Sequence, residues 1–310
     1  MNNISYSANS KEYLCEKTAR ETGFIKGGRE KKISRCCERA FFCGALLYLK
    51  RHREKMNVFT VDSSAFSELL TYLFIHTFHL TPEVKQEKVR GKNVFKVSVD
   101  DNEAQKVFPV LDEKKDLSDF ISCTDCTMYF LRGVFLACGT VSDPNSSYHA
   151  EFITPSADRA EALFSFLIVE NTEARVIKRG SSHVVYIKGR ERVSDFFAKI
   201  GAQRFALDVI EKSIEKEIKN NLNRSCNCES ANIRKTVSAS LEIKNAIDKI
   251  KKHGAWSSLS QELRDAAILR LEYPDASLSE LCLLNEGKAL SRSGLNHRLQ
   301  KILKIAKELD

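Results

Sequence analysis

The sequence predicts an α+β domain made of two similar halves, followed by an all-α domain with a helix-turn-helix at its end. Two observations support this prediction. A pattern of apolar residues and glycines in the first two thirds of the chain repeats at an offset of 89 residues, and the last hundred residues carry helical periodicity only. A chain of 310 residues with 43% hydrophobic content can bury a sizeable core and is long enough for two domains.

The first domain is organised around Phe130–Gly139, an apolar run in which small residues recur at three- to four-residue spacing. That spacing places Gly133, Ala137 and Gly139 along one side of a helix. A glycine inside a helix costs about 1 kcal/mol relative to alanine, so its presence indicates that a second backbone approaches closely. We expect Gly44, Gly133, Ala137 and Gly139 to lie at such an interface.

The second helix of this interface is predicted upstream, at Phe41–Leu49. The two runs match at four pairs of positions: Cys37 and Cys126, Phe41 and Phe130, Gly44 and Gly133, Leu47 and Leu136. Two such helices can pack across a pseudo-twofold axis. Two unrelated buried helices are the alternative, but the order helix, strand, helix, strand also repeats after each run, which favours a duplicated half-domain.

The remaining elements of the first domain follow from periodicity and caps. An amphipathic helix is predicted over residues 10–22 with Ser10 as its cap, followed by a loop containing Gly27 and Gly28. Residues 100–119 are predicted to form the last helix of the first half and a connector through Pro109. In the second half, the last helix is predicted to end at Gly201, which serves as its C-cap. The predicted domain is 1–204, with halves of about 1–115 and 116–204.

A charged helix with a narrow apolar stripe is predicted to link the two domains over residues 205–224. The stripe consists of Leu207, Ile210, Ile214 and Ile218. An asparagine-rich stretch, Asn220–Asn232, is expected to mark the end of this helix, and a new helix is expected from Ile233 to His253. The stretch can be read as capping side chains, or Arg224, Arg234 and Lys235 can contact phosphates.

The second domain, 225–310, is predicted to be helical, with a helix-turn-helix at about 277–310. Ser277 and Glu280 form a capping-box pattern, a turn follows at Asn285–Gly287, and a helix with a basic, polar amino-terminal end comes next. Arginine can pair with guanine and asparagine with adenine. The predicted DNA-binding residues are Ser277, Ser291, Arg292, Ser293, Asn296, His297, Arg298 and Lys301. A small helical bundle with solvated polar residues is the alternative.

Composition narrows the functional classes further. The net charge is +8, and residues 211–310 contain 18 Lys and Arg against 14 Asp and Glu, a mild basic excess that fits a nucleic-acid partner. No run of 18 uncharged apolar residues and no signal-peptide pattern occurs, so a cytoplasmic protein without membrane contact is expected.

Ten cysteines in a chain of this length are expected to be reduced thiols. Cys123-Thr-Asp-Cys126 and Cys226-Asn-Cys228 each have the spacing of half a zinc site, and Cys36-Cys37 are adjacent. Because neither spaced pair has an obvious partner pair nearby in the sequence, no metal and no cofactor are predicted.

The paired glycine helices resemble those of the LAGLIDADG homing endonucleases, in which two such helices join pseudo-symmetric αββαββα halves. A narrower resemblance covers nearly the whole chain. Four segments, in order, are similar to segments of the WhiA family of bacterial sporulation and cell-division regulators: Phe130–His149, Asn223–Asn232 with Lys235-Thr236, Ser277–Leu281 and Leu290–Leu299.

The resemblance implies a cytoplasmic, nucleoid-associated regulator of Gram-positive bacteria. In this family a degenerate endonuclease-like domain is joined to a helix-turn-helix similar to that of sigma factors, and members bind promoters and influence sporulation, cell division or chromosome segregation. The LAGLIDADG nucleases hold divalent metals with an acid at the penultimate motif position. Here those positions are Leu49 and Cys138, so we expect no nuclease activity.

The function expected from the sequence is therefore non-catalytic transcription regulation through double-stranded promoter DNA, with other transcription or division proteins as further partners. Two alternatives remain open. The chain can be an interaction protein of the division or segregation machinery that binds DNA weakly and without sequence preference, or it can be a residual nuclease.

Overall fold

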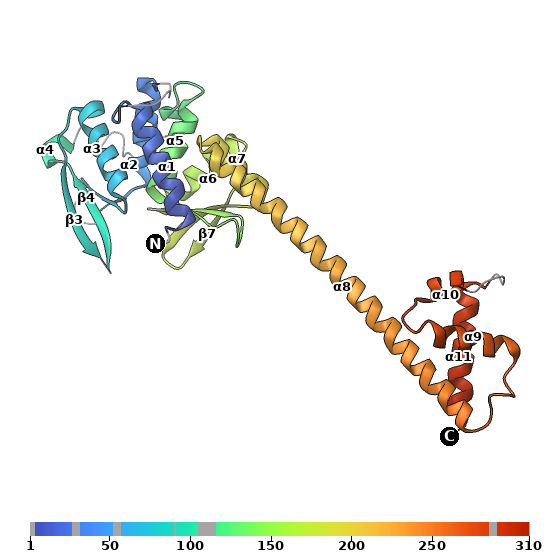
Figure 1. The fold of residues 1–310 in the computed structure, drawn as a ribbon. Helices are drawn as coiled ribbons and strands as arrows, with labels where there is room; N and C mark the ends of the chain where they lie inside the picture. The colour runs from blue at the N-terminus through green and yellow to red at the C-terminus, as the bar shows by residue number, and fades with distance from the viewer. Residues whose placement is uncertain are drawn as a thin grey trace. The chain divides into compact units, whose positions relative to one another are not determined.

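The computed structural model describes residues 4–26, 32–51, 57–89, 91–104, 116–284 and 290–309. The chain forms two compact units, residues 1–216 and 217–310 (Figure 1). The expected glycine loop at Gly27 and Gly28, the connector through Pro109 and the turn Asn285–Gly287 lie outside the described residues.

The first unit begins with α1 (Tyr6–Glu21) and then repeats one order of elements twice. The first half contains α2 (Arg35–Tyr48), β1 (Lys50–Arg51), β2 (Val58–Val61), α3 (Ser64–Phe78), β3 (Glu83–Val89), β4 (Lys92–Ser98) and α4 (Asp101–Ala104). After a short 3-10 turn, η2 (Leu117–Phe120), the second half contains α5 (Cys126–Cys138), β5 (Gly139–Val141), β6 (His149–Thr154), α6 (Ala157–Val169), β7 (Arg175–Arg179), β8 (Ser182–Lys188) and α7 (Arg190–Lys199).

The two halves share their sheet topology as well as their element order. Each forms a four-stranded antiparallel sheet, with strand orders β1-β2-β4-β3 and β5-β6-β8-β7. One face of each sheet packs on the common core, which includes Phe59 and Val97 in the first half and Phe152 and Val185 in the second. The predicted pair of αββαββα halves is therefore confirmed.

Helices α2 and α5 contact each other through their backbones at two glycines. A Cβ atom at Gly44 would lie 2.2 Å from the carbonyl oxygen of Phe130, and a Cβ atom at Gly133 would lie 2.1 Å from that of Phe41. These contacts are related by the 89-residue repeat. Ala137 packs at the edge of the core, and Gly139 is the C-cap of α5, where a Cβ atom would meet Phe135 of the same helix.

A fully buried arginine ties α1 and the end of α7 to α5. The Arg132 guanidinium donates to the carbonyl oxygen of Ile200 at 2.8 Å and to the Thr18 hydroxyl at 3.1 Å, and it pairs with a Glu21 carboxylate oxygen at 2.5 Å. Gly201 has a φ of +81°, and a Cβ atom there would lie 2.3 Å from an Arg132 nitrogen. Burying an ion pair is costly, so the hydrogen bonds around it are needed to offset the desolvation.

The start of α1 differs from the prediction. Ser5 is the N-cap, and its hydroxyl accepts from the backbone N–H of Ala8 at 3.2 Å. Ser10, the expected cap, is buried inside the helix and donates to the carbonyl oxygen of Ser7 at 2.8 Å. Both serines are suitable caps by residue type, so local sequence cannot decide between them.

The expected helix break in the asparagine-rich stretch is wrong. Helix α8 is continuous from Gln203 to Lys252. It contains neither glycine nor proline, and an asparagine in a helix costs at most about 0.7 kcal/mol relative to alanine, which does not force a break. The apolar stripe predicted for the linker is solvent-exposed: the residues of α8 that pack on the first unit's core are Phe205, Ala206 and Val209.

The second unit packs three short helices against the last part of α8. They are α9 (Gln261–Glu272), α10 (Leu278–Leu284) and α11 (Arg292–Lys307). Their common core includes Ile247 and Ile250 of α8, Ala267 of α9, Leu281 of α10 and Leu295 of α11. Among the described residues of the second unit, the regular elements are all helices, as predicted.

The glycine contact makes a stability prediction. Gly133→Ala places a methyl group against the Phe41 carbonyl, and relief requires the two helices to separate, so we expect a loss of about 3 kcal/mol in the unfolding free energy of the first unit. Differential scanning calorimetry measures the change. The matched control is Gly91→Ala, where no atom lies within 4 Å and only the strain of a φ of +79° is added, about 1–2 kcal/mol. Equal losses in both variants would contradict the prediction.

Candidate nucleic-acid interface

The predicted helix-turn-helix consists of α10 and α11, and serines begin both helices. The backbone N–H of Ser277 donates to a Glu280 carboxylate oxygen at 2.7 Å, and the N–H of Glu280 donates to the Ser277 hydroxyl at 3.3 Å, which confirms the capping box. The Ser291 hydroxyl accepts from the N–H of Gly294 at 3.1 Å as N-cap of α11. Both hydroxyls are therefore already engaged in caps.

Helix α11 has one buried and one exposed face. Its buried face contains Leu295, Leu299, Ile302 and Ala306. Most of the polar residues predicted to contact DNA are exposed on the other face: Arg292, Ser293, Asn296, His297 and Lys301. The exposed set lies in the first two and a half turns, so its side chains are free to meet a ligand that approaches the helix start.

A groove of about 450 Å³ runs beside this face, between α8, α10 and α11. Arg292, Asn296 and Gln300 line it from α11, at successive turns of the helix. Lys235 lines it from α8, and Ser277 lines it at the start of α10. The structure thus brings together the predicted residues Ser277, Arg292 and Asn296 with Lys235, which was predicted separately.

The Arg298 side chain forms an ion pair with α9 and does not line the groove. Its guanidinium lies 3.7 Å from a carboxylate oxygen of Glu262 in α9, and its side chain is 26% exposed. Arg298 is therefore only partly exposed and lies beside an acid, whereas Arg292 is exposed. The sequence could not indicate Glu262 as its partner, because the two residues are 36 positions apart.

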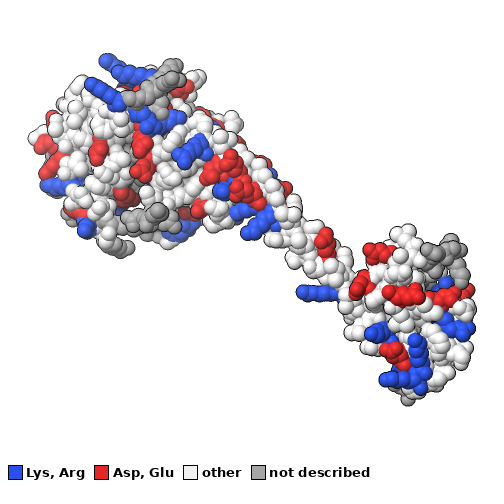
Figure 2. All heavy atoms as spheres, in the orientation of Figure 1, with Lys and Arg blue, Asp and Glu red and all other residues white. Residues whose placement is uncertain are grey.

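The two remaining predicted phosphate contacts, Arg224 and Arg234, are exposed on α8 and do not line the groove. The asparagine-rich stretch that contains Arg224 is exposed along its whole length. Lysines also gather in the last turns of α8 and α11. Figure 2 shows Lys and Arg side chains, in blue, at the lower end of the second unit. These lysines complement the negative ends of the helix dipoles, so their position has a structural reason.

Arg270 of α9 is a structural residue that sequence analysis did not identify. It is buried, and one guanidinium nitrogen donates to three carbonyl oxygens of the turn before α10: Tyr273 at 3.3 Å, Pro274 at 3.4 Å and Ala276 at 2.6 Å. Burial lowers the pKa of Arg270. The residue fixes the turn that places Ser277 and α10.

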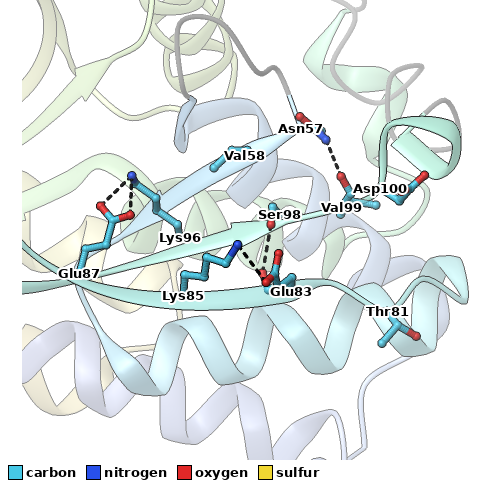
Figure 3. A pocket seen from close by; sticks show the side chains of 10 residues that line it. All are labelled: Asn57, Val58, Thr81, Glu83, Lys85, Glu87, Lys96, Ser98, Val99 and Asp100. Carbon is cyan, nitrogen blue, oxygen red and sulfur yellow. Dashed lines mark hydrogen bonds and ion pairs between the residues drawn. The ribbon is translucent and has the colours of Figure 1, made fainter.

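The outer faces of the two sheets carry acids that pair with their basic residues. In the first sheet a groove of about 550 Å³ contains the pairs Lys85–Glu83 at 3.0 Å and Lys96–Glu87 at 2.7 Å (Figure 3). In the second sheet, Arg179 hydrogen-bonds both Glu151 carboxylate oxygens, at 2.8 and 3.0 Å, and lowers the pKa of that carboxyl group. Both faces therefore have partly neutralised charge.

The predicted absence of nuclease activity rests on two residues, Leu49 and Cys138. Leu49 is the buried C-cap of α2, and Cys138 is the last residue of α5. Burial raises the pKa of Cys138 to about 12, so its thiol stays protonated at neutral pH. The cation near this end of α5 is a lysine: Lys11 donates to the carbonyl oxygen of Leu136 at 3.2 Å, and burial lowers its pKa.

Comparison with family models identifies both parts of the chain. Residues 127–219 match the WhiA LAGLIDADG-like domain, and residues 222–306 match the WhiA C-terminal HTH domain. No helix among the described residues combines the length and apolarity that a membrane crossing requires.

Curated relatives agree with these matches. A probable cell division protein WhiA from Clostridium acetobutylicum is 34% identical over 99% of this chain and 98% of its own. One from Clostridium botulinum is 34% identical over 81% and 84%, and one from Caldicellulosiruptor bescii is 43% identical over 59% and 56%. The crystal structure of full-length WhiA from Thermotoga maritima shares the fold, with a TM-score of 0.54, 24% identity and 98% coverage of both chains.

The Arg270 contacts predict a selective loss of stability in the second unit. Arg270→Ala leaves three turn carbonyls without their charged donor, so we expect the unfolding free energy of this unit to fall by about 2–3 kcal/mol. Urea unfolding followed by the fluorescence of Trp256 measures it, because this single tryptophan packs against the second unit's core. The exposed Arg224→Ala is the control and should change the midpoint little. An unchanged urea midpoint for Arg270→Ala would show that these three hydrogen bonds do not stabilise the second unit.

Proposed function

Since the chain belongs to the WhiA family, we propose that it is a non-catalytic, DNA-binding regulator of genes that act in cell division or sporulation. The observation that carries this proposal is the exposed polar start of α11 beside the groove formed with α8 and α10. The family's C-terminal HTH domain and the cell-division names of its relatives support it. Double-stranded promoter DNA on the chromosome is the proposed ligand.

Within this interface, we assign base contacts to Asn296 and Arg292. Both are exposed in the first turns of α11, and their side chains can each make two hydrogen bonds, asparagine with adenine and arginine with guanine. Ser293 and His297 are also exposed in these turns of α11, and we assign them further contacts with the major groove of the DNA. Ser277 and Ser291 act through their caps by holding the two helices in place.

Phosphate contacts are assigned to the lysines that flank this face. Lys301 is exposed one turn beyond His297, and Lys235 lines the groove from α8. Arg224 and Arg234 are exposed on α8, and we assign them phosphate contacts outside the groove. Arg298 is assigned a positioning role through Glu262, since the ion pair links α11 to α9.

The first unit is proposed to have no nuclease activity. Hard divalent cations need oxygen ligands beside the scissile phosphate, and a leucine and a protonated thiol occupy the two motif positions. On both sheet faces, acids pair with the basic residues. These acids weaken the attraction of the faces for a polyanion such as DNA. The unit therefore supplies a non-cleaving surface.

One observation favours the alternative of an interaction protein. The predicted stripe of Leu207, Ile210, Ile214 and Ile218 continues to Leu222 along about four turns of α8, and each of these residues is between 45% and 60% exposed. A stripe of this kind can bind a partner helix. The two functions differ in sequence preference: a regulator prefers particular sites, and the interaction protein binds a scrambled duplex equally well.

Two substitutions test the DNA interface. Asn296→Ala should weaken binding to a duplex selected from a random pool by about 1–3 kcal/mol and relax the preference at one base pair. Lys301→Ala should weaken binding to all duplexes and reduce the slope of log K against log salt by about 1. Fluorescence anisotropy with selected and scrambled duplexes measures both effects.

The control for these variants is Lys307→Ala, which removes one charge from the opposite end of the same helix. It should leave sequence preference unchanged. If Asn296→Ala bound the selected duplex like the unaltered protein, the base assignment would be wrong. If the unaltered protein showed no preference over the scrambled duplex, the interaction protein would replace the regulator.

A nicking assay tests the absence of nuclease chemistry. Supercoiled plasmid incubated with the purified protein and Mg²⁺ or Mn²⁺ should stay supercoiled, because no carboxylate occupies the motif positions. Cleavage that co-purifies with the protein and is lost when the metal is chelated would overturn this assignment.

A further inference from the structure

Four cysteines from two distant parts of the chain meet at the amino-terminal ends of α2 and α5. Cys36 and Cys37 lie in the first turn of α2, Cys123 precedes α5, and Cys126 is the first residue of α5. All four Sγ atoms lie within 4.8 Å of one another. Among the described residues, this is the one group of three or more cysteine, histidine or acidic side chains with such convergence.

The repeat explains why the two pairs meet. Cys37 and Cys126 occupy equivalent positions in the two halves, and their Sγ atoms are 3.9 Å apart. The reciprocal glycine contacts hold α2 and α5 close together, so equivalent residues at the helix starts become neighbours. Cys36 and Cys123 have no cysteine counterparts and complete the cluster from outside the symmetric pair, since their equivalents are Asp125 and Ser34.

The sulfur separations fit one small ion. Sγ of Cys123 lies 3.5 Å from Sγ of Cys37, 3.5 Å from that of Cys126 and 3.7 Å from that of Cys36. Four sulfurs at about 2.3 Å from a central Zn²⁺ in a tetrahedron are about 3.8 Å apart. These separations are far longer than the bond of about 2.05 Å in a disulfide, and the four residues are free thiols.

The surroundings favour thiolate ligands. The amino-terminal ends of two helices present positive dipole ends to the cluster, which stabilises negative charge on sulfur. The Ser34 hydroxyl lies 3.1 Å from Sγ of Cys36 and can orient that ligand.

We propose that Cys36, Cys37, Cys123 and Cys126 form a structural Zn²⁺ site that fastens the two halves of the first unit to each other. Four thiolates satisfy a tetrahedral ion completely and leave no position for substrate, so the role is structural. Metal binding displaces the thiol protons. The ion joins segments 86 residues apart at Cys37 and Cys123. This inference does not depend on the DNA-binding function.

Metal content of the full chain, purified under reducing conditions, tests the proposal. We expect one equivalent of Zn²⁺ per chain by mass spectrometry, and Co²⁺ added to the metal-free protein should give the visible absorption of a tetrahedral thiolate complex. Cys123→Ser and Cys36→Ser should each lose the stoichiometric Zn²⁺ and the tetrathiolate Co²⁺ spectrum. The matched control is the double variant Cys226→Ser/Cys228→Ser, which changes two exposed cysteines of α8 and should keep both signals.

Thermal unfolding provides a readout that does not require the variants to bind metal. Chelation should lower the Tm of the first unit by roughly 10 °C in the unaltered protein and leave the Tm of Cys123→Ser unchanged. The exposed Cys123 is the safest position to alter, and circular dichroism checks that the variant folds.

Several outcomes would overturn the site: no Zn²⁺ or Co²⁺ bound by the reduced protein, stoichiometric metal retained in Cys123→Ser, or metal lost in the α8 double variant. A disulfide between two of the four cysteines in protein purified without oxygen would also overturn it.

Discussion

The first unit depends on the contact between two helix backbones. Gly44 and Gly133 allow each helix to lie against a carbonyl oxygen of the other, at distances that no side chain larger than hydrogen permits. This contact is made twice because the halves are related by a repeat, and each half then builds the same four-stranded sheet beside its own helix. The contact thus fixes the spacing of α2 and α5 between the two halves.

The two ends of the α2–α5 helix pair carry chemically different side chains. Near the carboxyl-terminal ends lie Leu49, the buried C-cap of α2, and Cys138, the last residue of α5, and Lys11 donates to the carbonyl oxygen of Leu136 there. At the amino-terminal ends four thiols converge. The proposed zinc site thus lies at one end of the helix pair. Leu49 and Cys138, on which the proposed lack of nuclease activity rests, lie at the other end, and the proposed DNA contacts lie in the second unit.

Buried arginines have a comparable role in both units. Arg132 connects α5 with α1 and the end of α7, and Arg270 holds the turn that leads into α10. In each case a planar, charged donor contacts backbone carbonyl oxygens of a neighbouring segment. Such contacts help to set the positions of α5 and α10. They also explain why basic residues in this chain cannot all be read as phosphate contacts.

The sequence by itself determined the duplicated half-domain, the contact at Gly44 and Gly133, and the capping box at Ser277. These features are written in local periodicity or in a repeat, where spacing alone reports which residues share a face. Tertiary structure decided three other matters: that α8 continues through its asparagines, that Arg298 meets Glu262, and that Cys36 and Cys37 meet Cys123 and Cys126. Each involves competing local preferences or partners far apart in the chain, and only the packing of whole elements determines which side chains become neighbours.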